Sequence, residues 1–307
     1  MLGGSLMMMT GLLIVAGVSC SLNVSDSCQM ELARLQEQER LLKDQLQQQE
    51  LLLHRLQLLN QAGNRNHAQT HQVQDTQLTD CSQVFTAGFN LSGLYRIQPS
   101  SSPSALTVYC DMTEGGGWTV VQRRLNGSET FNRSWSEYKD GFGDMTAEFW
   151  LGNEILHHIT TQGNYSLKIN LEDFDDQQRY AEYKNLRVAD EKDHYRLSFG
   201  AFEGTAGDAL SGGHLAAESE WASHQGMKFS TYDQDNDNYR GNCAQEDRGG
   251  WWFNKCHSAH LNGVYYPRGH YSSLTDDGVV WYPWRGWWYS LKTTVMKLRP
   301  TDYQESI

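Results

Sequence analysis

Residues Ser230–Asp247 read S-T-Y-D-Q-D-N-D-N-Y-R-G-N-C-A-Q-E-D. This stretch limits the possible folds of the chain more than any other. Asp233, Asp235 and Asp237 alternate within it, and like charges at this spacing repel one another unless a cation lies among them. Carboxylate and carbonyl oxygens are the ligands that Ca²⁺ prefers, at about 2.3–2.6 Å. The spacing fits a calcium loop, but it also fits a solvated turn, because Asp, Asn and Gly are common turn residues.

Two positions exclude an EF-hand. Counting from Asp233, the sixth residue is Asn238 where an EF-hand has glycine, and the twelfth is Ala244 where it has a bidentate glutamate. If the stretch binds calcium, it is therefore a short loop of another kind, followed closely by Cys243.

The composition favours a globular protein that does not bind nucleic acid. The chain has 307 residues with a formal net charge of −12, and nucleic-acid binding requires a basic face. Its 28 Gly, 10 Trp and 15 Tyr are typical of a domain rich in loops and aromatic side chains.

The N-terminus and the sequons predict a secreted, extracellular glycoprotein. Residues 1–20 resemble a signal peptide, with an apolar run from Leu6 to Val18 that is too short to span a bilayer comfortably. No Lys or Arg precedes the run, so a signal anchor is the alternative; no later stretch is apolar enough to cross a membrane. Five Asn-x-Ser sequons are candidate N-glycosylation sites: Asn23, Asn90, Asn126, Asn132 and Asn164.

Six cysteines suit an oxidising compartment. Cys20 lies at the end of the predicted signal peptide. Neighbouring cysteines most simply pair with each other, as Cys81–Cys110 and Cys243–Cys256. Cys28 is then left over, which suggests an interchain disulfide; a free or capped thiol is the alternative.

Residues 28–60 predict a coiled coil. They are almost all Leu, Gln, Glu and Arg, without Gly or Pro. With Leu32 at an a position, Cys28 falls on the preceding d position, and most a and d sites are Leu: Leu32, Leu35, Glu39, Leu42, Leu46, Gln49, Leu53, Leu56 and Asn60. We expect a parallel homo-oligomer, most simply a dimer, with Cys28 beside its symmetry mate. A single amphipathic helix folded onto the globular part is the alternative.

The polar residues 61–79 predict a linker, and residues 80–307 predict an α+β domain with a mostly antiparallel sheet. Short β-prone runs occur at 105–109, 118–122, 165–169, 195–199, 279–282 and 295–298. Helices are expected around 134–138 and 153–160. Regular alternation of strands and helices is absent, which argues against a parallel sheet.

Several segments of this region fit one pattern. Residues 230–242, which carry the three aspartates, are called the aspartate loop. The segments before it are SGLY at 92–95, VYCDM at 108–112 and GGGWTVVQRR at 115–124; those after it are GWWFNKCH at 250–257, LNGVYY at 261–266 and WYSLK at 288–292. With these motifs, the chain resembles the fibrinogen C-terminal domain family over residues 80–307. The resemblance implies a globular domain with a twisted, mostly antiparallel sheet, short helices and long loops.

The resemblance also implies a calcium site. Asp235 and Asp237 would give carboxylates, while Tyr239 and Gly241 would give main-chain carbonyls. It implies the same two intrachain disulfides as the neighbour argument, and a cis peptide at Lys255–Cys256.

A ligand pocket is implied as well, lined by Glu246, Asp247, Cys256, His257, Asp276 and Trp287. In fibrin this pocket receives the N-terminal amine of a peptide knob, and in the lectin branch it receives acetyl groups. Trp287, Thr275 and Glu246 replace an arginine, a tyrosine and a glutamine of the fibrin gamma chain, which argues against knob binding. Six aromatic residues could form walls or plain core: Trp281, Tyr282, Trp284, Trp287, Trp288 and Tyr289.

Other chemistry finds little support. His257 and His260 lie near Cys243 and Cys256, but C-x12-C-H-x2-H is not a paired zinc knuckle, and oxidising conditions favour the disulfide. No phosphate loop, G-x-S-x-G or H-E-x-x-H motif occurs. We therefore predict that the chain is not an enzyme.

The resemblance implies a secreted, calcium-bound, disulfide-linked oligomer that acts by binding a cell-surface receptor. The expected roles are those of a liver-derived growth and metabolic factor, or hepatokine, and of an inhibitory ligand of lymphocyte-activation gene 3 on T cells. Lectin-like recognition of acetylated glycans and co-assembly with fibrin are the alternatives.

Overall fold

The computed structural model describes residues 78–212 and 219–304. The predicted signal peptide at 1–20, the coiled coil at 28–60 and nearly all of the linker at 61–79 lie outside the described residues, as do Cys28 and Asn23. Within the described ranges, no helix is both long and apolar enough to cross a membrane.

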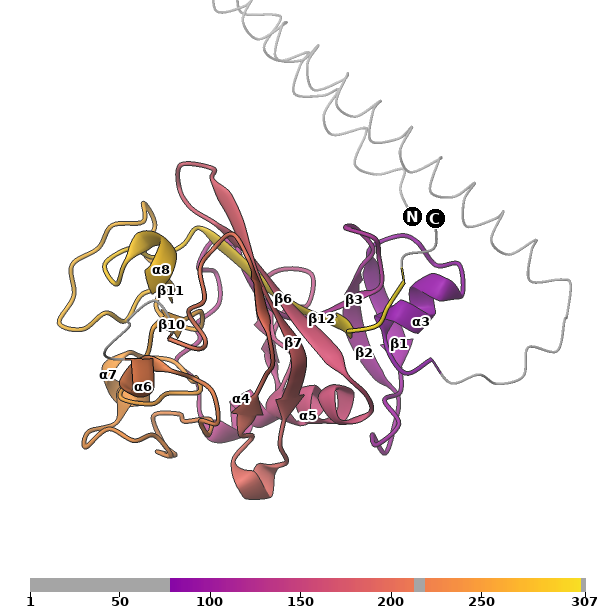
Figure 1. The fold of residues 1–307 in the computed structure, drawn as a ribbon, viewed down its shortest axis with the longest axis horizontal. Helices are drawn as coiled ribbons and strands as arrows, with labels where there is room; N and C mark the ends of the chain where they lie inside the picture. Colours follow the sequence, from indigo (N-terminus) through magenta and orange to yellow (C-terminus); the bar gives the residue numbers. More distant parts are fainter. Residues whose placement is uncertain (1–77, 213–218, 305–307) are drawn as a thin grey trace, which may run out of the picture. The chain divides into compact units, whose positions relative to one another are not determined.

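An antiparallel sheet organises the described part of the chain (Figure 1). Its main path runs, in spatial order, through β1 (Gly93–Ile97), β2 (Leu106–Asp111), β3 (Trp118–Arg124), β12 (Thr293–Pro300), β6 (Tyr165–Glu172), β7 (Gln178–Val188) and β8 (Leu197–Ser198). Off this path, β5 (Phe149–Trp150) pairs with β3 and with β4 (Phe142–Gly143), and β9 (Phe202–Gly204) pairs with β7. The C-terminal strand β12 therefore joins the two halves of the sheet by pairing with both β3 and β6.

The central strands form because their apolar residues alternate. Along β6 the side chains of Leu167, Ile169 and Leu171 are buried, while Lys168 and Asn170 between them are partly exposed. An aromatic cluster extends the core beyond the sheet: the ring centroids of Tyr138, Trp150, Phe229 and Trp252 lie 5.1 to 6.0 Å apart in their contacting pairs.

Two helices pack near this cluster. Ser134 caps α4 (Trp135–Asp140) in a capping box with Glu137, and α5 (Asn153–Thr161) buries Leu156 and Ile159. The remaining helices are short: α3 (Cys81–Thr86), the 3₁₀ helix η1 (Glu191–Asp193), α6 (Ser219–Ala222), α7 (Cys243–Glu246) and α8 (Tyr282–Arg285).

The predicted α+β fold with a mostly antiparallel sheet is confirmed. Each of the six expected strands and both expected helices overlaps an observed element. Six of the described strands were not predicted, and the longest of these is β7, which has 11 residues. Both expected intrachain disulfides, Cys81–Cys110 and Cys243–Cys256, are present.

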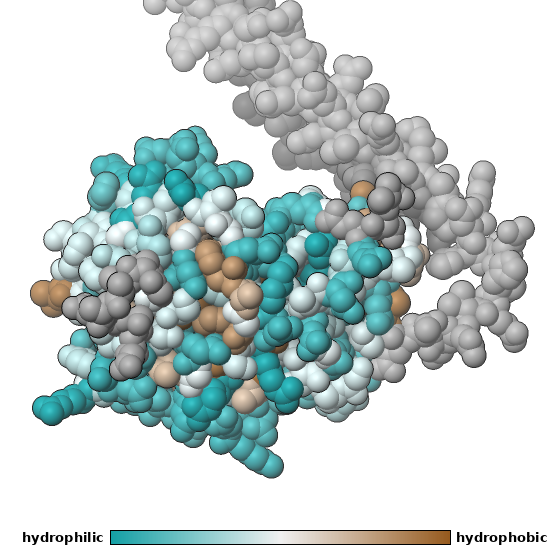
Figure 2. All heavy atoms as spheres, in the orientation of Figure 1, coloured by the Kyte–Doolittle hydropathy of each residue, from teal (hydrophilic) through white to brown (hydrophobic). Residues whose placement is uncertain are grey.

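Long loops collect at one end of the sheet. There α6, α7 and α8 lie around a small two-stranded sheet of β10 (Ala259–His260) and β11 (Val280–Trp281) (Figure 1). Figure 2 shows hydrophilic side chains over much of the visible face, with a smaller apolar area near its centre. This loop-rich end of the sheet contains the residues that the sequence predicts to form the functional sites.

Candidate functional site

The aspartate loop precedes α7 and folds around its own carboxylates. Asp237 accepts hydrogen bonds from the backbone N–H of Tyr239 and of Cys243, both at 2.9 Å. Asp235 accepts one from the backbone N–H of Asp237 at 3.2 Å. These bonds hold the Asp235 and Asp237 carboxylates beside each other.

Asp233 has a different role from its two neighbours. Its Oδ1 accepts hydrogen bonds from the backbone N–H of Trp135 at 2.9 Å and from the Thr231 hydroxyl at 2.7 Å. Trp135 is the first residue of α4, where backbone N–H groups have no partner within the helix. Asp233 therefore fastens the loop to α4, and only two of the three alternating carboxylates face each other.

The paired carboxylates fit a calcium ion. Within the described ranges, no Lys or Arg forms an ion pair with Asp235 or Asp237. Burial, followed by the neighbouring charge of Asp235, raises the pKa of Asp237 to about 6. Two adjacent carboxylates that form no ion pair in the described ranges, next to the exposed residues Tyr239 and Gly241, offer oxygen donors of the kind that Ca²⁺ prefers.

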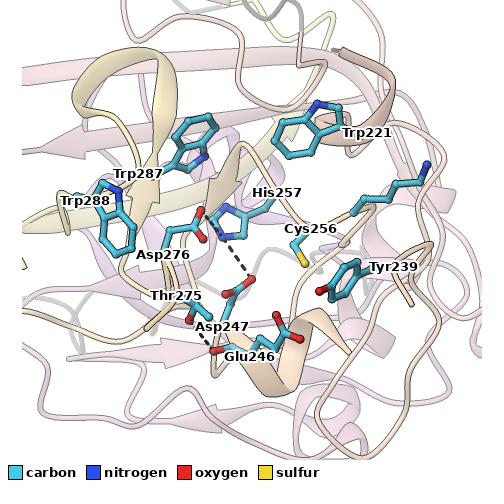
Figure 3. A pocket seen from close by; sticks show the side chains of 11 residues that line it. Trp221, Tyr239, Glu246, Asp247, Cys256, His257, Thr275, Asp276, Trp287 and Trp288 are labelled. Carbon is cyan, nitrogen blue, oxygen red and sulfur yellow. Dashed lines mark hydrogen bonds and ion pairs between the residues drawn. The ribbon is translucent and has the colours of Figure 1, made fainter. Parts of the chain in front are cut away.

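A cavity of about 350 Å³ lies beside this loop (Figure 3). The structure brings together all six residues expected there: Glu246, Asp247, Cys256, His257, Asp276 and Trp287. Five further residues complete the lining: Trp221, Tyr239, Lys255, Thr275 and Trp288.

Two carboxylates and an imidazole converge in the cavity (Figure 3). Nε2 of His257 lies 3.5 Å from Oδ2 of Asp247 and 3.6 Å from Oδ2 of Asp276. The side chains of His257 and Asp247 are 1% and 4% exposed, whereas that of Asp276 is 34% exposed. Burial raises the pKa of Asp247 to about 6, and the nearby Asp276 charge acts in the same direction.

The loop and the cavity form one structural unit. Tyr239 belongs to the loop and lines the cavity, while Cys243, directly after the loop, is bonded to Cys256 in the cavity wall. The peptide Lys255–Cys256 is cis, as expected. Within the lining, the Thr275 hydroxyl donates to the Glu246 carbonyl at 2.8 Å. The loop is therefore joined to the cavity wall by Tyr239 and by the Cys243–Cys256 disulfide.

The aromatic candidates separate into wall and core. Trp287 and Trp288 line the cavity, and the Tyr282 ring lies 3.8 Å from that of Trp287. Trp281 and Tyr289 are buried in the core, and Trp284 is close to the guanidinium groups of two arginines instead. Trp221 was missed, because it lies in a four-residue helix distant in sequence and carries no motif.

Four of the five sequons lie in the described ranges. Asn90, Asn126, Asn132 and Asn164 are all exposed, so each has room for a glycan. Their occupancy remains a prediction.

A family model for the C-terminal globular domain of the fibrinogen beta and gamma chains matches residues 77–301. The protein therefore belongs to the fibrinogen C-terminal domain family, as the motifs indicated. Since fibrinogen and fibrinogen-like protein 1 are not enzymes, the family assignment also confirms the prediction that this protein is not one.

Individual relatives resemble the chain over most of its length. Human fibrinogen-like protein 1 is 52% identical over 285 residues, which cover 91% of each chain, and the human fibrinogen gamma chain is 44% identical over 247 residues, 75% of this chain and 54% of its own. Among solved structures, the fibrinogen-like globe domain of human ANGPTL2 has 43% identity and a TM-score of 0.68, covering 73% of this chain and 99% of its own. Lamprey fibrin D-dimer complexed with the peptide Gly-His-Arg-Pro-amide has 37% identity and a TM-score of 0.71, covering 98% and 95%.

Proposed function

We propose that the protein is a secreted, calcium-binding, disulfide-linked oligomer that acts as a ligand for a cell-surface receptor protein. The proposal rests on the direct connection between the aspartate loop and the cavity, which Tyr239 and the Cys243–Cys256 disulfide provide. The disulfides and the predicted signal peptide support a secretory route.

Calcium in this proposal is structural. Asp235 and Asp237 would bind the ion with their carboxylates, and Tyr239 and Gly241 with backbone carbonyls. The bound ion would neutralise the paired carboxylates and order the loop, which forms part of the cavity wall. No chemical step follows from it.

The receptor assignment rests on likeness to fibrinogen-like protein 1. We propose lymphocyte-activation gene 3 as the receptor, and a hepatokine-like role in growth and metabolism. Two copies joined through residues 28–60 and Cys28 would raise avidity for clustered receptors.

Binding of the purified full-length protein to cells that display this receptor tests the proposal. We expect saturable binding in calcium, and loss of binding after chelation or in a variant with Asp235→Asn and Asp237→Asn. A matched variant with Asp175→Asn and Asp176→Asn removes the same charge from an exposed turn and should bind normally, because those side chains are 71% and 79% exposed. Equal binding to cells with and without the receptor would exclude this receptor.

Lectin-like recognition is a second candidate, favoured by the half-buried indoles of Trp221 and Trp287 that line the cavity, with ring centroids 6.5 Å apart. Calcium-dependent retention on N-acetylglucosamine resin would favour this function over receptor binding. Association with fibrin is a third candidate, tested by co-sedimentation with a fibrin clot; Glu246, Thr275 and Trp287 in the cavity lining weigh against it.

A further inference from the structure

His257 is buried but makes no hydrogen bond. Its side chain is 1% exposed, and within the described ranges neither Nδ1 nor Nε2 has a hydrogen-bond partner. A buried imidazole without hydrogen-bond partners destabilises the folded protein, so this position calls for a physical explanation.

The two carboxylates beside His257 lie slightly too far away to be its hydrogen-bond acceptors. The distances from Nε2, 3.5 Å to Asp247 and 3.6 Å to Asp276, exceed the range of ordinary hydrogen bonds. They agree closely with another geometry. Two donor atoms bound to one tetrahedral zinc ion, with metal–ligand bonds of about 2.0–2.2 Å, lie about 3.4 Å apart.

The remaining distance, between the carboxylate oxygens of Asp247 and Asp276, can shorten. The ligand atoms of Asp247, His257 and Asp276 all lie within 4.8 Å of one another. Asp276 is 34% exposed and comes from the loop before β11, so a small rotation of its side chain would bring its oxygen nearer to that of Asp247. Asp247 and His257 are fixed by burial and would provide the rigid half of a site.

We propose that Asp247, His257 and Asp276 form a zinc site, separate from the calcium loop. Imidazole is a ligand for Zn²⁺ rather than for Ca²⁺ or Mg²⁺, which prefer oxygen alone. Three protein ligands leave a fourth tetrahedral position, which would face the cavity. This donor set differs from the cysteine–histidine pattern that the sequence disfavours, and it uses neither Cys243 nor Cys256, which are joined in a disulfide.

Bound zinc would change the charge of the groups that the cavity prefers to bind. Without a metal, Asp247 and Asp276 favour a cationic group. A divalent ion would neutralise both carboxylates, and its open position would accept a carboxylate or carbonyl oxygen of a partner. The proposal does not depend on the receptor assignment, since it concerns only the ion.

Zinc binding by the full-length protein, saturated with calcium throughout, tests the site. We expect about one more tightly bound zinc ion per molecule in the wild type than in Asp276→Asn. The substitution should lower the zinc affinity at least roughly tenfold, since a substitution even of an outer-shell partner has an effect of about that size. Co²⁺ in place of Zn²⁺ should give the visible absorption of a tetrahedral site in the wild type and not in Asp276→Asn. His54, His67 and His71 lie outside the described residues, so the difference between variants is the quantity to measure.

His158→Gln is the matched control, because His158 Nε2 lies 3.6 Å from Glu154 Oε1 in a partly exposed pair that could also bind zinc. It should retain the zinc that Asp276→Asn loses. Unfolding midpoints in calcium without zinc check that each variant folds, and His257→Gln supplies a second ligand substitution if Asp276→Asn does not. Equal zinc binding by the wild type and a folded ligand variant, no tight zinc in the wild type, or loss of zinc in His158→Gln would each overturn the proposal.

Discussion

Glu148 is a buried carboxylate whose partners are backbone amides instead of a cation. Its Oε1 accepts hydrogen bonds from the N–H groups of Leu125, Asn126 and Gly127 at 2.6 to 2.9 Å, and its Oε2 accepts one from Glu129 at 2.9 Å. Burial acts to raise the pKa of Glu148, but these four donors outweigh it and hold the pKa below its usual value. One side chain thus fixes the loop that carries the sequon at Asn126.

Substitution of Glu148 should therefore be costly. Glu148→Gln replaces a charged acceptor that serves four amides, and we expect the free energy of unfolding to fall by about 2 kcal/mol. Urea denaturation measures it, with Glu203→Gln as the control because the Glu203 side chain is 59% exposed. Equal stability of the two variants would show that the carboxylate charge is not what holds the loop.

His224 is a second buried group whose charge state is fixed by its surroundings. Its Nδ1 lies 2.8 Å from the Trp252 carbonyl, and its Nε2 lies 3.3 and 3.2 Å from the N–H groups of Ser258 and Ala259. An imidazole with a proton on Nδ1 alone satisfies all three contacts. Burial lowers its pKa to about 3, so the ring stays neutral in the folded protein.

This depressed pKa predicts loss of stability in acid. The unfolded protein takes up a proton near the ordinary histidine pKa of about 6.5, while the folded protein does not. The contribution of His224 is thus present above about pH 6.5 and falls by about 1.4 kcal/mol per pH unit down to the folded pKa. We expect the ring resonances of His224 in NMR spectra to stay unshifted from pH 7 down to about 4. Titration with a midpoint near 6.5 would contradict the prediction.

At the scale of elements, the sequence predicted strands well where apolar residues alternate or run together, as in β3, β6 and β12. It missed β7, which reads Q-R-Y-A-E-Y-K-N-L-R-V, because charged residues separate its buried positions Ala181, Tyr183, Leu186 and Val188. The strand forms because β6 and β9 pair along it, and this tertiary pairing leaves no local signal.

The aspartate loop illustrates a similar limit. Its alternating carboxylates predicted a cation site, but the sequence did not reveal that Asp233 turns away to bind the N-terminus of α4. The partner, Trp135, lies 98 residues earlier in the sequence. Motif spacing identified the loop, whereas the different roles of its aspartates depend on the fold.

Asp233→Ala separates these roles. We expect it to lower stability by about 1–2 kcal/mol, because the Trp135 N–H and the Thr231 hydroxyl lose their acceptor. Calcium binding should survive, since Asp235 and Asp237 remain. Thermal unfolding with and without calcium distinguishes the two effects. Loss of the calcium response in Asp233→Ala would place this residue among the ligands.

At the scale of the whole molecule, the cavity combines separate stretches: Trp221, the segment 239–257, the loop at 275–276 and the pair 287–288. Six lining residues were predicted from the family resemblance, because members of a family share the fold that brings such residues together. Trp221 and Lys255 have no sequence signal that marks them as cavity residues and could be found only once the protein was folded. That the arrangement also leaves His257 without a hydrogen bond is invisible in sequence.

Oligomerisation is also a prediction about the whole molecule, and the residues that it concerns lie outside the described ranges. Cys28→Ser should convert the covalent dimer, or higher species, to monomer on a non-reducing gel, because Cys28 is the cysteine left over outside the signal peptide and the intrachain pairs. Light scattering then reports whether residues 28–60 still associate without the bridge. An unchanged gel pattern would exclude the interchain disulfide.

The proposal that calcium orders the loop beside the cavity is tested most directly by thermal unfolding of the full-length protein during a calcium titration. We predict that stability rises with calcium, by about 2.7 kcal/mol when the ion is at a hundredfold excess over its Kd. The variant with Asp235→Asn and Asp237→Asn should lose this rise, and the variant with Asp175→Asn and Asp176→Asn should keep it. An unfolding curve of the wild type that calcium and chelator leave unchanged would contradict the account.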